Sequence, residues 1–286
     1  MKPIFSVSEF TTWNLSFEED VALYLHLGIK AMEVCERKLS PDREKSKEQL
    51  AYLKGTGLKV SSVQPRVHAL FPDSMSPEPD SPDMRAEAYK NSIDLFSEFF
   101  PGAPLVAISG NAPDYNYRLA YETALRLYPE LADYAASRAM RIMFEPLHPI
   151  LMNNDSFIGT LQAGLELIDA VNRENFGLML DVWHVFHEPG IEERIAALKG
   201  RIFGVHICDW SKAWPRCVAD RAIPGQGMIQ FPALLAAIEA SGYDGAYCLE
   251  LFSAEHLPDS LWRQDPEHVI EQSKTYFYKA WEARHA

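Results

Sequence analysis

The chain has 286 residues, which is enough to bury a sizeable core in one or two domains. Its 27 lysines and arginines stand against 40 aspartates and glutamates, and the net charge of −13 disfavours non-specific binding to nucleic-acid phosphates. No apolar stretch approaches the roughly 18 residues of a membrane span, and the first residues lack the apolar core of a signal peptide. We therefore expect a cytoplasmic protein that binds neither nucleic acid nor membrane.

Eight short apolar runs, each bounded by turn residues, have the composition of buried strands in a parallel sheet. In chain order, we expect strands at Ile4–Val7, Ala31–Cys35, Leu58–Val63, Leu105–Ser109, Arg141–Glu145, Gly177–Asp181, Ile202–His206 and Ala246–Leu251.

A helical segment follows each of these runs. Two of the segments have serine before them and glycine after them, which are residues that favour helix termini. We expect helices at Phe17–Leu27, Pro41–Lys54, Met84–Phe99, Tyr117–Ala139, Phe157–Val171, Gly190–Leu198, Pro232–Ala240 and Glu267–Arg284.

Strand and helix thus alternate eight times, with about 36 residues for each pair. This alternation indicates a single α/β domain over residues 1–286, a (β/α)₈ barrel, rather than two packed domains. The Pro-rich segment Phe71–Pro82 is interpreted as a long loop after the third strand and not as a domain boundary.

Four acidic or imidazole side chains each follow or end one of the apolar runs: Glu145, Asp181, His206 and Glu250. In a (β/α)₈ barrel the active site lies at the C-terminal ends of the strands, so the four should converge there. Each alone is also compatible with a helix cap or a structural ion pair. Together, three carboxylates and an imidazole suit one divalent ion of manganese, magnesium, cobalt or zinc.

Further polar residues follow the same strand ends. His184 lies three residues after Asp181 and is a candidate substrate donor, a second ligand or a core histidine. Asp209, three residues after His206, either supports the site or starts the next loop. His148, three residues after Glu145, is ambiguous in the same way.

The loop after the seventh strand contains Asp220, Arg221 and a Gly225-x-Gly227 pair. The glycines indicate a tight turn more than a phosphate site. Arg221 is the candidate for function, because a guanidinium beside a metal site can hold a substrate carboxylate, phosphate or hydroxyl.

The order and spacing of these residues resemble the xylose-isomerase-like TIM barrels. This superfamily includes ketose 3-epimerases, hydroxypyruvate isomerases, inosose and dehydroshikimate dehydratases, and apurinic endonucleases. The resemblance covers residues 141–253 and rests on Glu145, Asp181-x-x-His184, His206-x-x-Asp209, Asp220-Arg221-x-x-x-Gly225-x-Gly227, Gly242-Tyr243-Asp244-Gly245 and Glu250. It implies that Glu145, Asp181, His206 and Glu250 are metal ligands and that His184 contacts substrate.

The same resemblance argues against the endonucleases, which bind a zinc cluster through extra histidines. Ala222 stands where one of these histidines is expected, and Ser109-Gly110-Asn111 ends the fourth strand where another is expected. With those ligands missing and a strongly negative charge, a role in DNA repair is disfavoured.

We therefore predict a metal-dependent isomerase or epimerase of a small polyol or keto-sugar. Glu145 and Glu250 would exchange a proton next to a carbonyl, through an enediolate that the metal stabilises. A dehydratase acting on an inosose-like or dehydroshikimate-like ring and a non-catalytic polyol-binding barrel are the alternatives. Trp13 and His68 are candidate substrate contacts on the N-terminal loops, where ordinary loop packing explains them equally well. The substrate, the metal and any homo-oligomer stay open.

Overall fold

The computed structural model describes residues 2–213 and 215–286 of the chain. The strands of its main sheet are β1 (Ile4–Ser8), β2 (Ala31–Cys35), β3 (Lys59–Gln64), β4 (Pro104–Ala107), β5 (Arg141–Phe144), β6 (Phe176–Asp181), β7 (Ile202–Ile207) and β10 (Ala246–Leu249). In the order β1-β10-β7-β6-β5-β4-β3-β2 they form a closed barrel. The predicted barrel of eight parallel strands is confirmed, and all eight predicted strands are present within a few residues of their expected bounds.

The α-helices between the strands are α1 (Phe17–His26), α2 (Arg43–Thr56), α3 (Pro82–Ser97), α4 (Tyr117–Ala136), α5 (Leu161–Val171), α6 (Val182–Val185), α7 (Ile191–Ala196), α8 (Phe231–Ala240) and α9 (Pro266–Ala283). Short 3₁₀ turns occur at η1 (Glu36–Lys38), η2 (Pro113–Tyr115), η3 (Pro149–Leu151) and η4 (Leu261–Arg263). Among the described residues, no helix combines the length and the apolar character that a membrane span needs.

The chain folds into two compact units, and each is discontinuous in sequence. Unit 1 comprises residues 1–34, 56–61 and 181–286, and unit 2 comprises residues 35–55 and 62–180. The prediction of one domain over residues 1–286 therefore stays a prediction.

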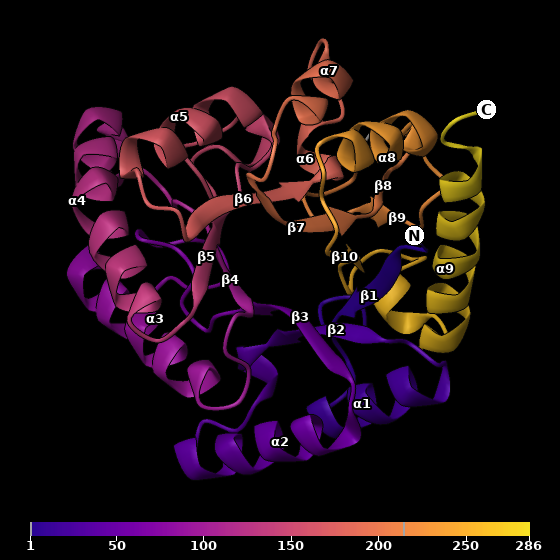
Figure 1. Cartoon of the computed structure of the whole chain (residues 1–286), viewed down its shortest axis with the longest axis horizontal. Helices are drawn as coiled ribbons and strands as arrows, with labels where there is room; N and C mark the ends of the chain where they lie inside the picture. The colour runs from indigo at the N-terminus through magenta and orange to yellow at the C-terminus, as the bar shows by residue number, and fades with distance from the viewer. Residues whose placement is uncertain (1, 214) are drawn as a thin grey trace. The chain divides into compact units, whose positions relative to one another are not determined.

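In unit 2, β4 pairs with β5 and β5 with β6, all parallel and in register. Helices α3 and α4 pack against each other on the outer side of these strands (Figure 1). The Pro-rich segment Phe71–Pro82 is a loop that leads into α3, as expected. The expected helix at Phe157–Val171 begins only at Leu161, because the Thr160 side chain caps it by accepting the backbone N–H of Ala163.

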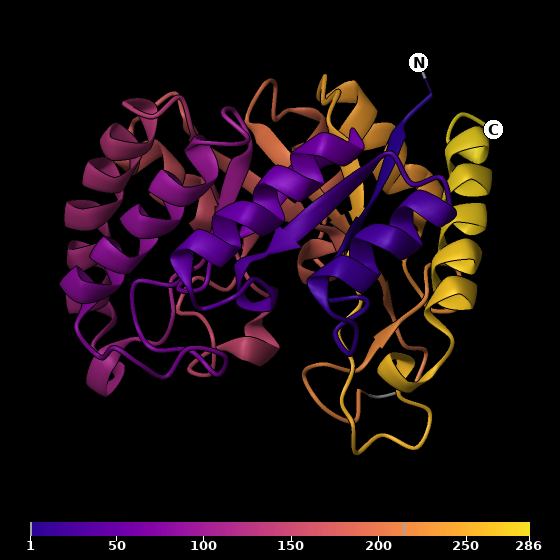
Figure 2. The same ribbon diagram turned by 90° about the horizontal axis from the view of Figure 1, so that it is seen from below.

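In unit 1, β10 lies between β1 and β7, and α8 packs against α9 beside them (Figure 1). The segments after β7 and β10 extend from the same end of this unit (Figure 2). The first of them contains two short antiparallel strands, β8 (Asp209–Trp210) and β9 (Arg221–Ala222), where the sequence predicted only a loop. This small sheet fixes the position of Arg221.

Candidate metal centre

Three of the predicted ligands come from the strand ends of unit 1. Asp181 is the last residue of β6, His206 lies near the end of β7, and Glu250 follows β10 directly. Cys248 of β10 is level with His206, and the backbone N–H of Glu250 donates to the carbonyl of Ile207 at 3.2 Å. Because side chains alternate along a strand, His206 and Glu250 point to the same face.

The three side chains are almost completely buried, with exposed fractions of 1% for Asp181, 0% for His206 and 3% for Glu250. Each offers one ligand atom, and these atoms lie within 4.8 Å of one another. His206 Nδ1 and Glu250 Oε2 are 3.3 Å apart. The structure therefore brings Asp181, His206 and Glu250 together as a candidate metal-binding group.

His184 and Arg221 each place a nitrogen close to the Asp181 carboxylate. His184 Nε2 is 3.5 Å from Asp181 Oδ2, and Arg221 Nη1 is 3.2 Å from the same oxygen. The guanidinium also stacks over the Trp183 ring, 3.7 Å from its centroid, and donates to the Cys208 sulfur. Both candidates thus lie in the group that contains Asp181, and Arg221 is buried within it.

The charges of these neighbours change how the carboxylates titrate. Burial alone would raise the pKa of Asp181, but the positive charges of His184, Arg221 and His206 outweigh it and hold the pKa below its usual value. Burial raises the pKa of Glu250 above the ordinary range of a glutamate, although His206 opposes the rise. Two neighbouring carboxylates therefore differ in proton affinity, which suits one to remain an anion and the other to exchange a proton.

Asp209 shapes the loop that carries Arg221. Its carboxylate accepts the backbone N–H groups of Trp210, Gly225, Gly227 and Ile229, at 2.8 to 3.0 Å. A Cβ at Gly227 would lie 2.2 Å from the Asp209 carboxylate, so a larger residue there would displace it. Of the two roles expected for Asp209, this geometry supports the one in the loop.

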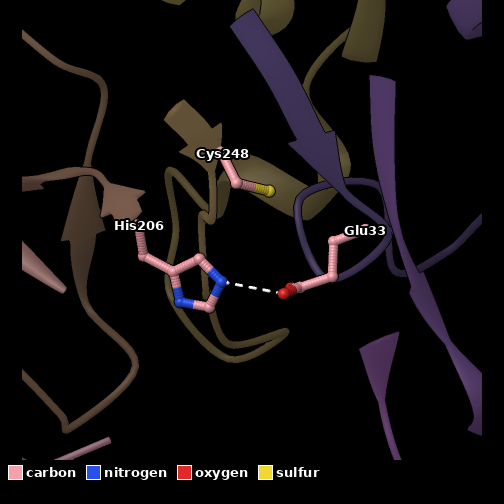
Figure 3. Close-up of side chains that lie close together, drawn as sticks. All are labelled: Glu33, His206 and Cys248. Atoms are coloured by element: carbon pink, nitrogen blue, oxygen red, sulfur yellow. Dashed lines mark hydrogen bonds and ion pairs between the residues drawn. The ribbon is translucent and has the colours of Figure 1, made fainter. Parts of the chain in front are cut away.

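Glu33 and Cys248 lie next to His206 and were not among the predicted site residues. Glu33, in the middle of β2, places its Oε2 2.9 Å from His206 Nε2, and Cys248 lies beside the pair (Figure 3). Glu33, His206 and Cys248 also form a group that could hold a metal ion. The signal that could have revealed Glu33 is a charged residue inside the otherwise apolar run Ala31–Cys35.

The remaining predicted site residues are divided between the two units. Trp13 of unit 1 stacks between Phe10 and Trp262 on the loop after β1, with ring centroids 5.6 and 6.1 Å away. In unit 2, Glu145 is buried directly after β5, and its backbone N–H donates to the carbonyl of Ala107. The other two candidates of unit 2 are histidines: His148 accepts the N–H of Ile150 at the start of η3, and burial lowers the pKa of His68.

The residues present fit a divalent ion. Two carboxylates and an imidazole are ligand types that zinc and manganese both accept. Buried carboxylates that approach each other so closely need compensating positive charge, and Arg221 supplies part of it through its contact with Asp181. A metal ion would supply the remaining charge.

Comparison with known proteins shows the family and the fold of the chain. Residues 21–277 match the xylose isomerase-like TIM barrel family, and the chain belongs to that family. The inosose isomerase of Bacillus subtilis is 33% identical over 141 residues, which cover 47% of this chain and 48% of that protein. The L-ribulose 3-epimerase of a Methylomonas species is 32% identical over 132 residues, covering 46% and 42% of the two chains. The aligned segments thus span about half the length of these relatives.

Solved structures show the same fold. The IOLI protein with a binding zinc atom has a TM-score of 0.77 at 24% identity, over 98% of both chains. An L-ribulose 3-epimerase structure has a TM-score of 0.76 at 19% identity, over 100% of this chain and 96% of that one. The relatives bear the names of isomerases, epimerases and dehydratases, so the family is one of enzymes.

Proposed function

We propose that the protein is a divalent-metal-dependent isomerase or epimerase of a small keto-sugar or polyol-like substrate. The observation that carries this proposal is the buried group of Asp181, His206 and Glu250 at three strand ends. The zinc in the IOLI structure and the isomerase and epimerase names of the relatives support it. The choice among zinc, manganese, magnesium and cobalt stays open.

We propose Glu145 as the fourth ligand. Phe144 of β5 is level with Leu178 of β6, so Glu145 follows on at the level of Met179. Asp181 lies two residues further along β6, and side chains two residues apart point to the same face. The burial of the Glu145 carboxylate also supports a role inside the protein rather than in solvent.

When bound, the metal supplies positive charge that stabilises the negative charge developing on a substrate carbonyl oxygen. The proton is moved by the chain's own carboxylates. The raised pKa of Glu250 suits it to accept a proton from a carbon next to the carbonyl and to return it. Glu145 would act on the opposite side of the substrate, as epimerisation requires two groups on two faces.

The donors around Asp181 would bind the substrate. His184 and Arg221 are proposed to hold its oxygens, with Arg221 positioned by its stack on Trp183. Trp13, His68 and His148 are proposed to line the rest of the pocket, while Asp209 holds the loop after β7 in place. The cytoplasmic location and a homo-oligomeric state stay predictions.

A dehydratase is the second candidate. The 3-dehydroshikimate dehydratase of Pseudomonas aeruginosa is 32% identical over 135 residues, which cover 43% of this chain and 20% of that protein. Removing a proton next to a carbonyl begins this reaction too, and loss of a β-hydroxyl completes it. A DNA-repair role is disfavoured by the residues at the expected histidine positions, because Ala222 carries no ligand atom and Ser109 is hydrogen-bonded to Ser156 at 2.9 Å.

The test is an NMR screen of the metal-loaded protein against ketoses, inososes and dehydroshikimate in deuterated water. Deuterium incorporation without loss of water would support the isomerase or epimerase. An enone product absorbing in the ultraviolet would support the dehydratase instead. Neither exchange nor turnover with any of these substrates, in a preparation that holds metal, would contradict the proposal.

A further inference from the structure

The contact between Glu33 and His206 joins residues 173 positions apart in the sequence. The register explains how they meet: Ser6 of β1 is level with Cys248 of β10 and with Ala31 of β2, and Cys248 is level with His206. Glu33 lies two residues beyond Ala31, so its side chain points to the same face as those of Cys248 and His206. Both partners of the pair are fully buried. Figure 3 shows their side chains pointing toward each other.

The two nitrogens of the His206 ring face different groups. Nε2 lies 2.9 Å from Glu33 Oε2, a hydrogen-bond distance, whereas Nδ1 faces Glu250 Oε2 at 3.3 Å. Nδ1 is therefore the nitrogen turned toward the candidate metal group. To bind a metal, this nitrogen must present its lone pair, which requires the ring proton on Nε2.

We propose that Glu33 is a positioning residue of the metal centre: it accepts the Nε2 proton of His206, fixes the ring orientation and leaves Nδ1 free to bind the ion. A carboxylate behind a histidine ligand commonly has this effect on ring orientation and ligand strength. The inference rests on the proposed function, because it needs a metal at Asp181, His206 and Glu250.

An ion held by Glu33, His206 and Cys248 is the competing use of the same side chains. The geometry favours positioning. An ion between Nε2 and Oε2 would replace the hydrogen bond that these atoms make at 2.9 Å, and it would turn the ring's metal-binding nitrogen away from Glu250. The two uses therefore differ in which ring nitrogen binds metal and in whether the Cys248 sulfur is needed.

The experiment measures Mn²⁺ affinity of the full chain by electron paramagnetic resonance for wild type, Glu33→Gln, Cys248→Ser and Glu188→Gln. Glu188→Gln is the matched control, since it removes a largely buried carboxylate that pairs with Arg194 at 2.8 Å. We expect about one ion per wild-type chain and an affinity roughly 10- to 100-fold weaker in Glu33→Gln. Cys248→Ser and Glu188→Gln should bind within about twofold of wild type.

A second measurement needs no variant and holds even if Glu33→Gln fails to fold. Nitrogen-15 NMR of the zinc-loaded wild type should show the metal on Nδ1 of His206 and a slowly exchanging proton on Nε2. Wild-type affinity in Glu33→Gln would overturn the role of Glu33 while leaving the metal centre standing. Metal on Nε2, or loss of the ion in Cys248→Ser, would instead assign the ion to the group of Glu33, His206 and Cys248 and overturn the role of Glu33. A wild-type chain that binds no ion would overturn the metal centre and this inference together.

Discussion

Each unit contains a buried arginine–aspartate pair, and the two pairs have different roles. In unit 2, Arg85 pairs with Asp73 at 3.0 Å and also donates to the backbone carbonyls of Ala69, Ser76 and Pro79. In unit 1, Arg221 pairs with Asp181 at 3.2 Å, stacks on an aromatic ring and contacts a thiol.

The difference lies in the partners of each guanidinium. Arg85 donates to the carbonyls of Ser76 and Pro79 in the Pro-rich segment 71–82 and so anchors that loop. Arg221 directs its charge to a carboxylate that is itself a candidate ligand. A buried ion pair thus indicates a loop anchor when its other partners are backbone atoms, and a site when they are side chains with ligand chemistry.

The largest effect is expected at the two carboxylates proposed to move protons. Glu250→Gln and Glu145→Gln should each reduce turnover by about 10²- to 10⁴-fold, because an amide does not exchange a proton as a carboxylate does. The measurement is kcat on metal-saturated protein, since both residues are also proposed ligands. Near wild-type turnover in either variant would move proton transfer to another residue.

Arg85→Ala tests the other side of the comparison. Its loss leaves the Asp73 carboxylate and three carbonyls without their cation, which should cost about 3–5 kcal/mol in the free energy of unfolding. Urea unfolding of the two proteins gives the difference, and metal content of the folded protein should stay at the wild-type level. Unchanged stability together with lost metal would reverse the roles assigned to the two arginines.

Arg221→Ala should act on catalysis rather than on metal content. Loss of one charged hydrogen bond costs about 1.5–3 kcal/mol, so kcat/KM should fall roughly ten- to a hundredfold. Metal content should persist, because Arg221 is not a proposed ligand and its loss leaves the Asp181 carboxylate in place. Kinetics within twofold of wild type would mean that Arg221, like Arg85, only anchors its loop; Arg221→Lys separates the charge from the stack on Trp183.

A surface pair provides the smallest effect. Hydrogen bonds from Arg284 lower the pKa of Glu239 to about 2. Slight burial opposes this shift, and a hydrogen bond from His285 adds to it. Because this pKa is lower in the folded protein than the value of about 4.3 in the unfolded chain, the ionised Glu239 stabilises the fold at pH values above about 4.3. That stabilisation is lost as the pH falls toward 2. The pair is partly exposed, so Glu239→Gln should cost at most about 1 kcal/mol. Urea unfolding should show the difference at pH 7 and a smaller one at pH 3, whereas equal differences at both would exclude ionisation as its cause.

The clustering of Asp181, His206 and Glu250 at strand ends could be predicted because its signal is local. A charged or imidazole residue at the end of a short apolar run marks Asp181, His206 and Glu250 without knowledge of any partner. The barrel followed from the alternation of strands and helices along the chain, which also depends on neighbours in sequence. The same reasoning predicted Arg221 as a site residue from its place in a loop beyond β7.

The partners of these residues could not be predicted, because they depend on register between distant segments. Glu33 meets His206 because of the register in which β2 pairs with β1, β1 with β10 and β10 with β7. The residues near Glu33 in sequence give no sign of a histidine partner. The short strands β8 and β9 could not be predicted either, because a strand of two residues has no periodicity in its sequence. Their pairing is nevertheless what holds Arg221 near Asp181.

Metal content is the most direct test of the proposed centre. Elemental analysis after loading and desalting should give about one divalent ion per wild-type chain, and His206→Ala should lose most of it, because it removes the only imidazole among the four proposed ligands. Arg85→Ala, which removes a loop anchor of unit 2, should keep the ion. A wild-type chain without metal, or a stoichiometry unchanged in His206→Ala, would contradict a metal centre built from Asp181, His206 and Glu250.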